Sequence, residues 1–327
     1  MVRILHVTGY GVSIGFSRGS LRVRSKSGET SVPLNEVDVV VVASSGVSIS
    51  SKAVRWLVRS GVEVVVLDHR GDPVGILYSS HYTRTPETRR AQYEALHNGL
   101  GARIAAEIAY SKVASQACHL RSLASRGEAR LRPVYRELES YAEEIAGMEA
   151  GDLESTRKRL VSIEAAAARI YWQGVADVLP RDLGFEGRDR YSLDPVNSSL
   201  NYGYGILYSL AWRSLVMAGL DPYAGFLHVD RSGKPVLAFD YVEMFRVAAV
   251  DRPLVETLRR GWRPRLDNGR LDYRDRERIA GLIASRLGEK ARGAYRAMSL
   301  DEAIRGYSLR LAKCLRDKSP FQGYRGC

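Results

Sequence analysis

Residues 225–246 read Gly225-Phe-Leu-His-Val-Asp-Arg-Ser-Gly-Lys-Pro-Val-Leu-Ala-Phe-Asp-Tyr-Val-Glu-Met-Phe-Arg246. An apolar segment ends at His228, a polar turn follows, and a second apolar segment contains Asp240 and Glu243. If that second segment is a helix, residues three apart share one face, so both carboxylates point the same way. The turn allows this face to fold back against His228. A histidine and two acids beside apolar walls predict a divalent-metal site.

Helical periodicity continues on both sides of this stretch. Apolar side chains at helical spacing predict helices over residues 87–125, 133–146, 152–178, 198–218, 236–259 and 274–287. Polar stretches over 184–195 and 261–270 separate some of them. From Pro86 onward the chain is therefore expected to be helical.

The first eighty residues have a different sequence pattern, which predicts strands instead of helices. Short β-rich runs predict strands over 3–8, 12–16, 20–25, 29–33, 37–42, 62–67 and 73–78, with one short serine-capped helix over 50–59. The glycines at 9, 11 and 15 resemble a dinucleotide fingerprint, but their spacing is wrong and no helix follows, so hairpin turns are favoured. His69 and His81 are interpreted as surface turn residues.

These patterns predict an α+β fold. An N-terminal β-strand domain spans residues 1–80, a linker spans 81–86, and a larger all-α C-terminal catalytic domain spans 87–327.

The chain is strongly basic, with a net charge of +12 over 327 residues. Such a surplus favours an anionic partner, nucleic acid first and a membrane surface second, although solvation alone also accounts for it. From residue 251 onward, 19 Lys and Arg stand against 10 Asp and Glu. Arginines flank Trp262 there, a pattern that either binds phosphates and stacks on a base or forms a solvated helix face.

Cys118, Cys314 and Cys327 have no metal-ligand spacing, and their odd number does not suggest a disulfide framework. A reducing, cytoplasmic location is therefore expected. The longest apolar run, 39–43, is too short to span a bilayer, and the N-terminus lacks a secretory signal, so no membrane association is expected. The tail 323–327 is expected to be disordered.

A third acid, Glu164, precedes four alanines in a strongly helix-favouring run that leaves room for a second helix to approach closely. Taken alone, a glutamate in this setting is more often a solvated helix residue. Four motifs occur in order, at 163–171, 197–207, 219–228 and 237–246. Together they resemble the CRISPR-associated adaptation nuclease-integrase family, whose members are the first-numbered Cas proteins (Cas-one).

The resemblance implies a function and its partners. Members cut DNA with a divalent metal and insert short DNA fragments into CRISPR arrays, which is the spacer-acquisition step of antiviral defence. It implies a homodimer built largely through the β domains and a small dimeric partner (Cas-two). The expected nucleic acid is double-stranded DNA, both the spacer precursor and the CRISPR repeat.

The resemblance also implies the ligands. Carried over by motif, they are Glu164, His228 and Glu243, with Asp240 a secondary or water-mediated candidate that would orient His228. Carboxylates suit Mg²⁺ or Mn²⁺, and the imidazole favours Mn²⁺. Many members have Pro after the Phe-Arg pair, where this chain has Val247, which is expected to shift the helix end.

Two other functions stay open at this point. One is a non-enzymatic, basic DNA-binding scaffold, and the other is a metal-dependent structure-specific nuclease or RNase. Tyr171, Trp172, Tyr202 and Tyr204 are able to stack on splayed bases, but core positions are the more frequent role of such aromatics. The role of Asn201 is open.

Overall fold

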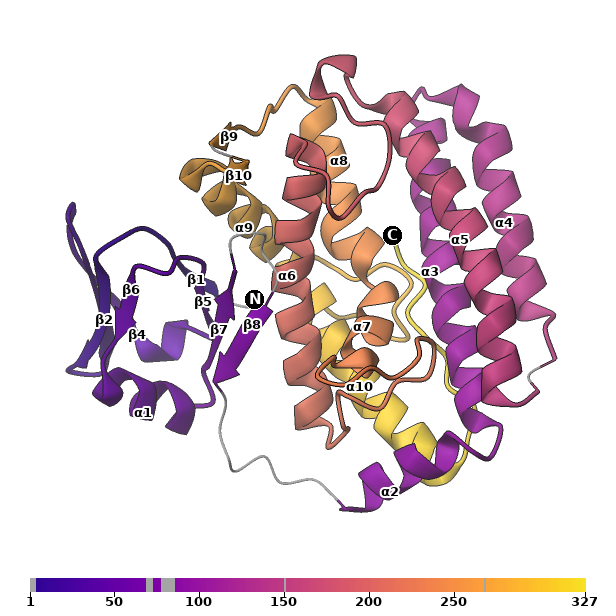
Figure 1. The fold of residues 1–327 in the computed structure, drawn as a ribbon, viewed down its shortest axis with the longest axis horizontal. Coiled ribbons are helices and arrows are strands. Elements are labelled where there is room, and N and C mark those ends of the chain that lie inside the picture. The colour runs from indigo at the N-terminus through magenta and orange to yellow at the C-terminus, as the bar shows by residue number, and fades with distance from the viewer. Residues whose placement is uncertain (1–3, 69–72, 78–85, 150, 268) are drawn as a thin grey trace. The chain divides into compact units, whose positions relative to one another are not determined.

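The structure is a computed structural model that describes residues 4–68, 73–77, 86–149, 151–267 and 269–327. A strand-rich N-terminal region precedes a mostly helical region, as the alternating and helical periodicities predict (Figure 1). The predicted α+β fold class is confirmed.

Two four-stranded sheets make up the N-terminal region. In one, the order is β4 (Gly28–Pro33), β3 (Ser20–Ser25), β2 (Val12–Ser17) and β6 (Val47–Ile49). In the other it is β1 (Ile4–Val7), β5 (Val39–Val42), β7 (Glu63–Leu67) and β8 (Pro73–Leu77). Strands β1, β5 and β7 run parallel, and β8 is antiparallel to β7. Strand β6 was not predicted.

The residue pattern explains these sheets. All four valines of β5 are buried, which is typical of a strand covered on both faces. In β3, Leu21 is buried while Arg24 is exposed, so one face of this sheet is wet. Helix α1 (Ser51–Arg59) begins at the Ser50 side chain, which accepts a hydrogen bond from Ala53 N, and buries Leu57 in the same apolar core.

The chain forms two compact units. The first combines described residues of 1–81 with residues 190–209 and 263–288; the second contains those of 82–189, 210–262 and 289–327. The described residues do not include the predicted end of the N-terminal domain at residue 80 or most of the predicted linker 81–86. They also do not include His69 and His81. The predicted two-domain division therefore stays a prediction.

Most predicted helices are present, with bounds close to those expected. They are α4 (Arg132–Ala146), α5 (Leu153–Val178), α6 (Pro195–Met217) and α9 (Tyr273–Gly288). The helix predicted over 87–125 is two helices, α2 (Pro86–Ala95) and α3 (Leu100–Ser125), because Gly99 has a φ of 78°. Helix α10 (Leu300–Asp317) and the short strands β9 (Leu266–Asp267) and β10 (Arg270–Leu271) were not predicted.

The segment predicted as one helix over 236–259 has three parts. Helix α7 (Val236–Glu243) is followed by the π-helical segment η4 (Val247–Asp251) and by α8 (Arg252–Arg259). The π-helical turn begins at Val247, the residue at which the sequence departs from the family pattern.

The C-terminal residues differ from the expectation. Cys118 on α3 forms a disulfide with Cys327, so the expectation from the odd number of cysteines, that they form no disulfide framework, is wrong for this pair; Cys314 is a free thiol. An odd number of cysteines is compatible with one disulfide and one free thiol, as found here. The tail is ordered, since Tyr324 is fully buried with its ring stacked on Phe245. The Arg325 guanidinium contacts the Glu107 carboxylate at 2.7 Å.

A buried histidine makes stability depend on pH. His119 Nδ1 lies 2.9 Å from Tyr171 Oη, which donates to Asp251, while His119 Nε2 is buried and has no hydrogen-bond partner among the residues that the structure describes. Burial, with the nearby Arg252 charge, lowers the pKa of His119 from 6.5 to about 3. His119 therefore takes up a proton below about pH 6.5 in the unfolded chain, but only below about pH 3 in the folded chain.

We expect the free energy of unfolding to fall as the pH decreases from 6.5, by about 1.4 kcal/mol per unit from this group. Urea unfolding between pH 7 and pH 4 would measure it, with His119→Gln as the non-titrating comparison. The variant should have the shallower slope. Equal slopes would show that His119 does not contribute.

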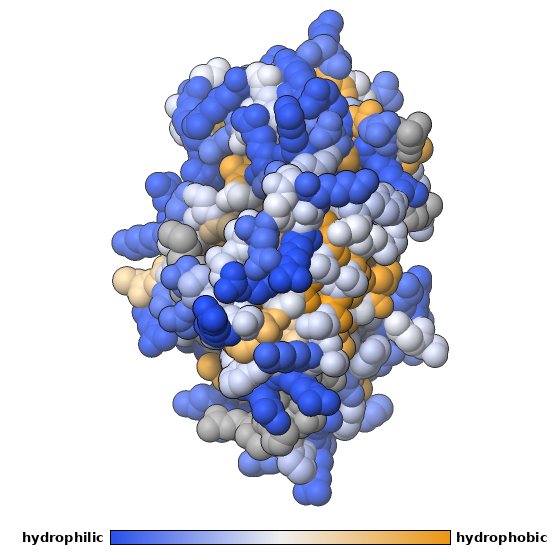
Figure 2. All heavy atoms as spheres, turned by 90° about the vertical axis from the view of Figure 1, so that its left-hand side faces the viewer, coloured by the Kyte–Doolittle hydropathy of each residue, from blue (hydrophilic) through white to orange (hydrophobic). Residues whose placement is uncertain are grey.

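One face of the molecule carries mostly hydrophilic side chains, with apolar ones in limited areas between them (Figure 2). Within the described ranges, no helix has the length and apolar character needed to cross a bilayer.

Candidate metal centre

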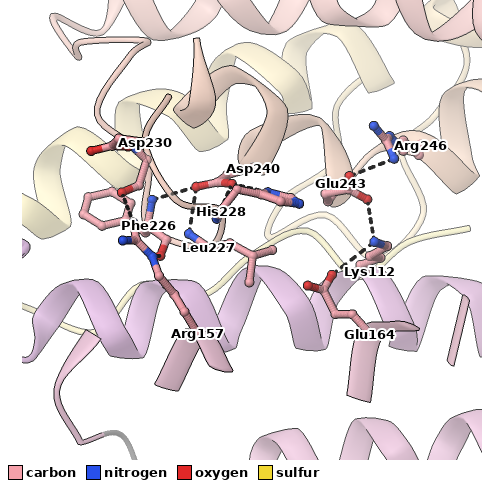
Figure 3. A network of polar contacts seen from close by, with 11 residues as sticks. Lys112, Arg157, Glu164, Phe226, Leu227, His228, Asp230, Asp240, Glu243 and Arg246 are labelled. Carbon is pink, nitrogen blue, oxygen red and sulfur yellow. Dashed lines mark hydrogen bonds and ion pairs between the residues drawn. The ribbon is translucent and has the colours of Figure 1, made fainter. Parts of the chain in front are cut away.

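Three helices bring two acids to one ammonium group. Helix α3 packs against α5 and α7, and Figure 3 shows Lys112 of α3 between Glu164 of α5 and Glu243 of α7. Lys112 Nζ lies 3.1 Å from Glu164 Oε1 and 3.0 Å from Glu243 Oε2. Arg246 Nη1 lies 2.7 Å from the other oxygen of Glu243. The two acids expected from separate motifs thus share one cation.

The electrostatics keep Glu243 ionised. Burial opposes its charge, but the charges of Arg246, Lys112 and His228 outweigh burial and lower the pKa of Glu243 to about 2. Burial likewise opposes the charge of Lys112, and the Glu164 and Glu243 carboxylates more than compensate, which raises the pKa of Lys112. At neutral pH the site therefore holds an ionised acid and an ionised lysine side by side.

Asp240 is fully buried and directs its carboxylate at the loop before α7. Its Oδ2 accepts hydrogen bonds from Phe226 N at 2.6 Å and Leu227 N at 2.8 Å. Its Oδ1 accepts from His228 N at 3.0 Å and contacts His228 Nδ1 at 2.6 Å. A carboxylate has about four acceptor positions, and these four contacts use them in this structure. The arrangement suits the orienting role, and whether Asp240 also reaches a metal through water stays a prediction.

His228 is held at one end and available at the other. The contact of His228 Nδ1 with the acceptor Asp240 Oδ1 favours a proton on Nδ1, so that Nε2 would be the nitrogen through which a metal could bind. This hydrogen bond raises the pKa of His228, with burial opposing and the Asp240, Glu243 and Glu164 charges adding to it. In Figure 3 the imidazole lies between the Asp240 and Glu243 carboxylates.

Other side chains fix the loop that carries His228. Arg157 Nε and Nη2 donate to the carbonyl oxygens of Phe226 and Gly225 at 2.7 and 2.8 Å. The buried Gln92 side chain bonds the backbone of Asp221 and Ala224. A Cβ on Gly225 would stand 2.4 Å from Val236 Cγ1, so this position admits glycine alone without movement of α7. The loop is thus held firmly from three directions.

The donor set fits a hard divalent cation. Glu243 Oε2 is buried with the Lys112 ammonium as its charge partner, and it accepts no hydrogen bond of good geometry from the described residues. An acidic oxygen in that state is suited to a metal. Three metal-binding side chains do not yet stand close enough together to hold an ion, as far as the described residues extend. The ligand roles of Glu164, His228 and Glu243 therefore stay a prediction.

Sequence reasoning missed Lys112, Arg157 and the contact made by Arg246. One signal for Lys112 was available: between Arg103 and Arg121, the helix carries two charged residues, Glu107 and Lys112. Glu107 contacts the tail and Lys112 the acids, so both have specific partners.

The aromatic residues that were candidates for base stacking, together with Asn201, are mostly buried or bonded within the fold. Tyr171, Trp172 and Tyr202 are buried, as their core alternative predicts, and Tyr204 is half-buried. Asn201 donates to the carbonyl oxygen of Arg190. Trp262 is also buried, so it is not available for stacking on a base in this conformation. Arg276, in the same basic cluster, donates to Ala43 O.

Known proteins resemble the whole chain. A family described as CRISPR associated protein Cas1 matches residues 5–280. The CRISPR-associated endonuclease Cas1 of Hyperthermus butylicus is 37% identical over 330 residues, which is 99% of this chain and 98% of its own length.

Two solved structures share the fold. A casposase bound to integration product has a TM-score of 0.85 at 20% identity, over 99% of this chain and 93% of that one. A chain of a Cas6-RT-Cas1–Cas2 complex has a TM-score of 0.79 at 20% identity, over 100% of this chain and 36% of that longer chain.

Proposed function

Because this chain belongs to the CRISPR associated protein Cas1 family, we propose that it is a metal-dependent DNA endonuclease and integrase that inserts short DNA fragments into a CRISPR array. The relative from Hyperthermus butylicus is named an endonuclease. The casposase that shares the fold was solved with an integration product. Both names support phosphodiester chemistry on DNA.

One observation carries the proposal. Two acids from different helices, Glu164 and Glu243, share a single cation beside an imidazole whose Nδ1 is fixed by Asp240. This arrangement gathers negative charge at one point and presents a nitrogen ligand next to it. Glu164, His228 and Glu243 would hold Mg²⁺ or Mn²⁺, which would supply Lewis-acid polarisation of a phosphodiester and activation of its nucleophile.

The chain's own groups prepare that chemistry. Asp240 accepts from His228 Nδ1, so in the neutral imidazole Nε2 is the nitrogen without a proton. A metal there would compete with the second proton that the raised pKa of His228 favours. Arg246 neutralises one oxygen of Glu243 and keeps the acid ionised well below neutral pH. Arg157 and Gln92 hold the loop, which fixes His228 relative to the acids. Preorganised groups of this kind position a nucleophile and a phosphate at little cost during the reaction.

The same arrangement serves two reactions. With water as nucleophile, the phosphodiester is cleaved; with a DNA 3′-hydroxyl, the fragment is joined to the target strand. Either way one P–O bond forms as another breaks, and the leaving 3′-oxygen takes up a proton. Double-stranded DNA, as spacer precursor and as CRISPR repeat, is the proposed substrate of both.

The proposed assembly is a homodimer with the small partner Cas2. A fold neighbour is named as part of a Cas1–Cas2 complex, which supports this partner. The surplus of Lys and Arg from residue 251 onward supplies positive charge for DNA.

Metal removal provides the direct test. We expect a 3′-hydroxyl-ended duplex fragment to be joined to a repeat-containing plasmid in Mn²⁺ or Mg²⁺, and joining to be lost in EDTA. Labelled fragments separated on denaturing gels measure the product, with and without the partner. DNA binding at fixed salt should change little in EDTA, because phosphate contacts by Lys and Arg require no metal.

The alternatives predict other outcomes. Salt-sensitive DNA binding without joining or cleavage in any metal would indicate a scaffold. Preferential cleavage of branched DNA or of RNA, assayed beside the duplex, would indicate a structure-specific nuclease or RNase.

A further inference from the structure

We propose that Lys112 is an internal counter-cation that occupies the metal position until the metal displaces it, and that it thereby sets the metal affinity of the site. The inference rests on the proposed metal site of Glu164, His228 and Glu243. It assigns Lys112 a positioning role, because its ammonium acts through the acids.

The contacts place the ammonium where the metal charge belongs. Its distances of 3.1 Å to Glu164 Oε1 and 3.0 Å to Glu243 Oε2 put one positive charge between the two acids. Both carboxylates are almost fully buried, with 9% and 4% of their side-chain surfaces exposed. Two buried acids facing each other without a cation would repel strongly in a medium of low dielectric. Lys112 removes that repulsion when no metal is present.

A metal and the ammonium cannot both use these oxygens. A Mg²⁺ ion binds carboxylate oxygens at about 2.1 Å, so an ion on Glu243 Oε2 lies within about 5 Å of Nζ in its present position. Two cations that close repel, and each acid oxygen has to exchange the ammonium for the metal. The ammonium therefore has to swing away on its flexible four-carbon stem.

Arg246 is not an equivalent competitor. It contacts the other oxygen of Glu243, from three residues along the same segment of chain. It can stay in place while Lys112 moves. Lys112 bridges Glu164 and Glu243, and the Arg246 contact uses the Glu243 oxygen that Lys112 does not touch.

The test is metal affinity in the absence of DNA. Lys112→Met keeps the stem and removes the charge, and Lys158→Met is the matched control. Lys158 is exposed on α5 and pairs with Glu154 outside the site, so the control makes the same change in net charge. Isothermal titration with Mn²⁺ gives the dissociation constants. Thermal unfolding with and without Mn²⁺ gives the linked stability.

We expect K112M to bind Mn²⁺ at least 10-fold more tightly than the unchanged chain, while K158M binds within twofold of it. Without metal, K112M should unfold at a lower temperature, and Mn²⁺ should raise its melting temperature more than that of the unchanged chain. A purely structural role for Lys112 predicts weaker binding in K112M. Equal or weaker binding in K112M, with Mn²⁺ bound by the unchanged chain, would overturn the inference.

The other possible results also support or contradict the inference. If K112M is unfolded without metal, recovery of its helical circular dichroism on Mn²⁺ addition supports the inference, and failure to recover at any Mn²⁺ concentration contradicts it. Absence of Mn²⁺ binding in every protein would reject the proposed metal site itself. Normal Mn²⁺ binding without strand transfer would reject the proposed function and leave the inference standing.

Discussion

Glu164→Gln is expected to reduce metal-dependent cleavage and strand transfer by a factor on the order of 10³, which is about 4 kcal/mol in the activation barrier. The amide keeps the size of the side chain and removes the charge that a divalent ligand set needs. It leaves Lys112 paired with Glu243 alone, so the helices keep one of their two ionic contacts. The fold should persist.

The control for this variant is on the same helix. Glu154→Gln makes the same chemical change in the first turn of α5, where Glu154 is exposed and pairs with Lys158. Single-turnover strand-transfer rates in Mn²⁺ measure the effect, with DNA binding as the second readout. We expect E154Q to behave as the unchanged chain and E164Q to bind DNA normally. Strand transfer by E164Q within twofold of the unchanged chain would exclude Glu164 as a ligand.

Tyr324→Ala is expected to lower the free energy of unfolding by about 3–5 kcal/mol, as large-to-small changes of buried aromatics do. Tyr324 is fully buried, its ring stacks on Phe245 at a centroid distance of 5.0 Å, and it meets the edge of Tyr307 at 5.8 Å. The cavity would open against the ring of Phe245, which follows Glu243 by two residues in the chain.

Urea unfolding at neutral pH, with the disulfide intact in both proteins, measures this change. Tyr324→Phe keeps the stacked ring and serves as the comparison, with an expected loss of at most about 1.5 kcal/mol. A loss below about 1 kcal/mol in Y324A would mean that the tail contributes little to the core around α7.

The sequence predicted the element types where periodicity is strong. Alternation in residues 20–25 identified a strand with one wet face, and the 3.6-residue period of residues 152–178 identified α5 almost to its ends. It failed at residues 96–99, where apolar spacing continues through the break between α2 and α3. The Asn98-Gly99 pair was the local signal for that break, and Gly99 has the positive φ that favours glycine.

Pairings between distant residues were beyond periodicity. Cys118 and Cys327 are separated by 209 residues, and a count of three cysteines gives no information about which are close in space. The tail 323–327 contains small and polar residues that are typical of frayed ends, but Tyr324 packs against Phe245, two residues beyond α7, and Tyr307 of α10. Only tertiary contact turns such a segment into ordered structure.

The candidate site was partly predictable. Spacing placed Asp240 and Glu243 on one turn, and the turn before Pro235 indicated that His228 would fold back toward them. The division of labour between the two acids follows from hydrogen bonds to backbone amides of residues 226–228, which no spacing pattern encodes. Lys112 was missed because a single lysine in an apolar helix has no motif.

The π-helical segment η4 changes the helical register of the residues that follow it in α8. An α-helix advances by about 100° per residue, and a π turn holds one residue more than an α turn, so every side chain after Asp251 is rotated by about that angle relative to an uninterrupted helix. Arg252, the first residue beyond it, donates to Cys327 O at 2.7 Å. Before η4, Glu243 contacts Lys112 of α3, and after it Arg252 contacts the C-terminal tail. The change of register at η4 thus separates the directions in which these two side chains make their contacts.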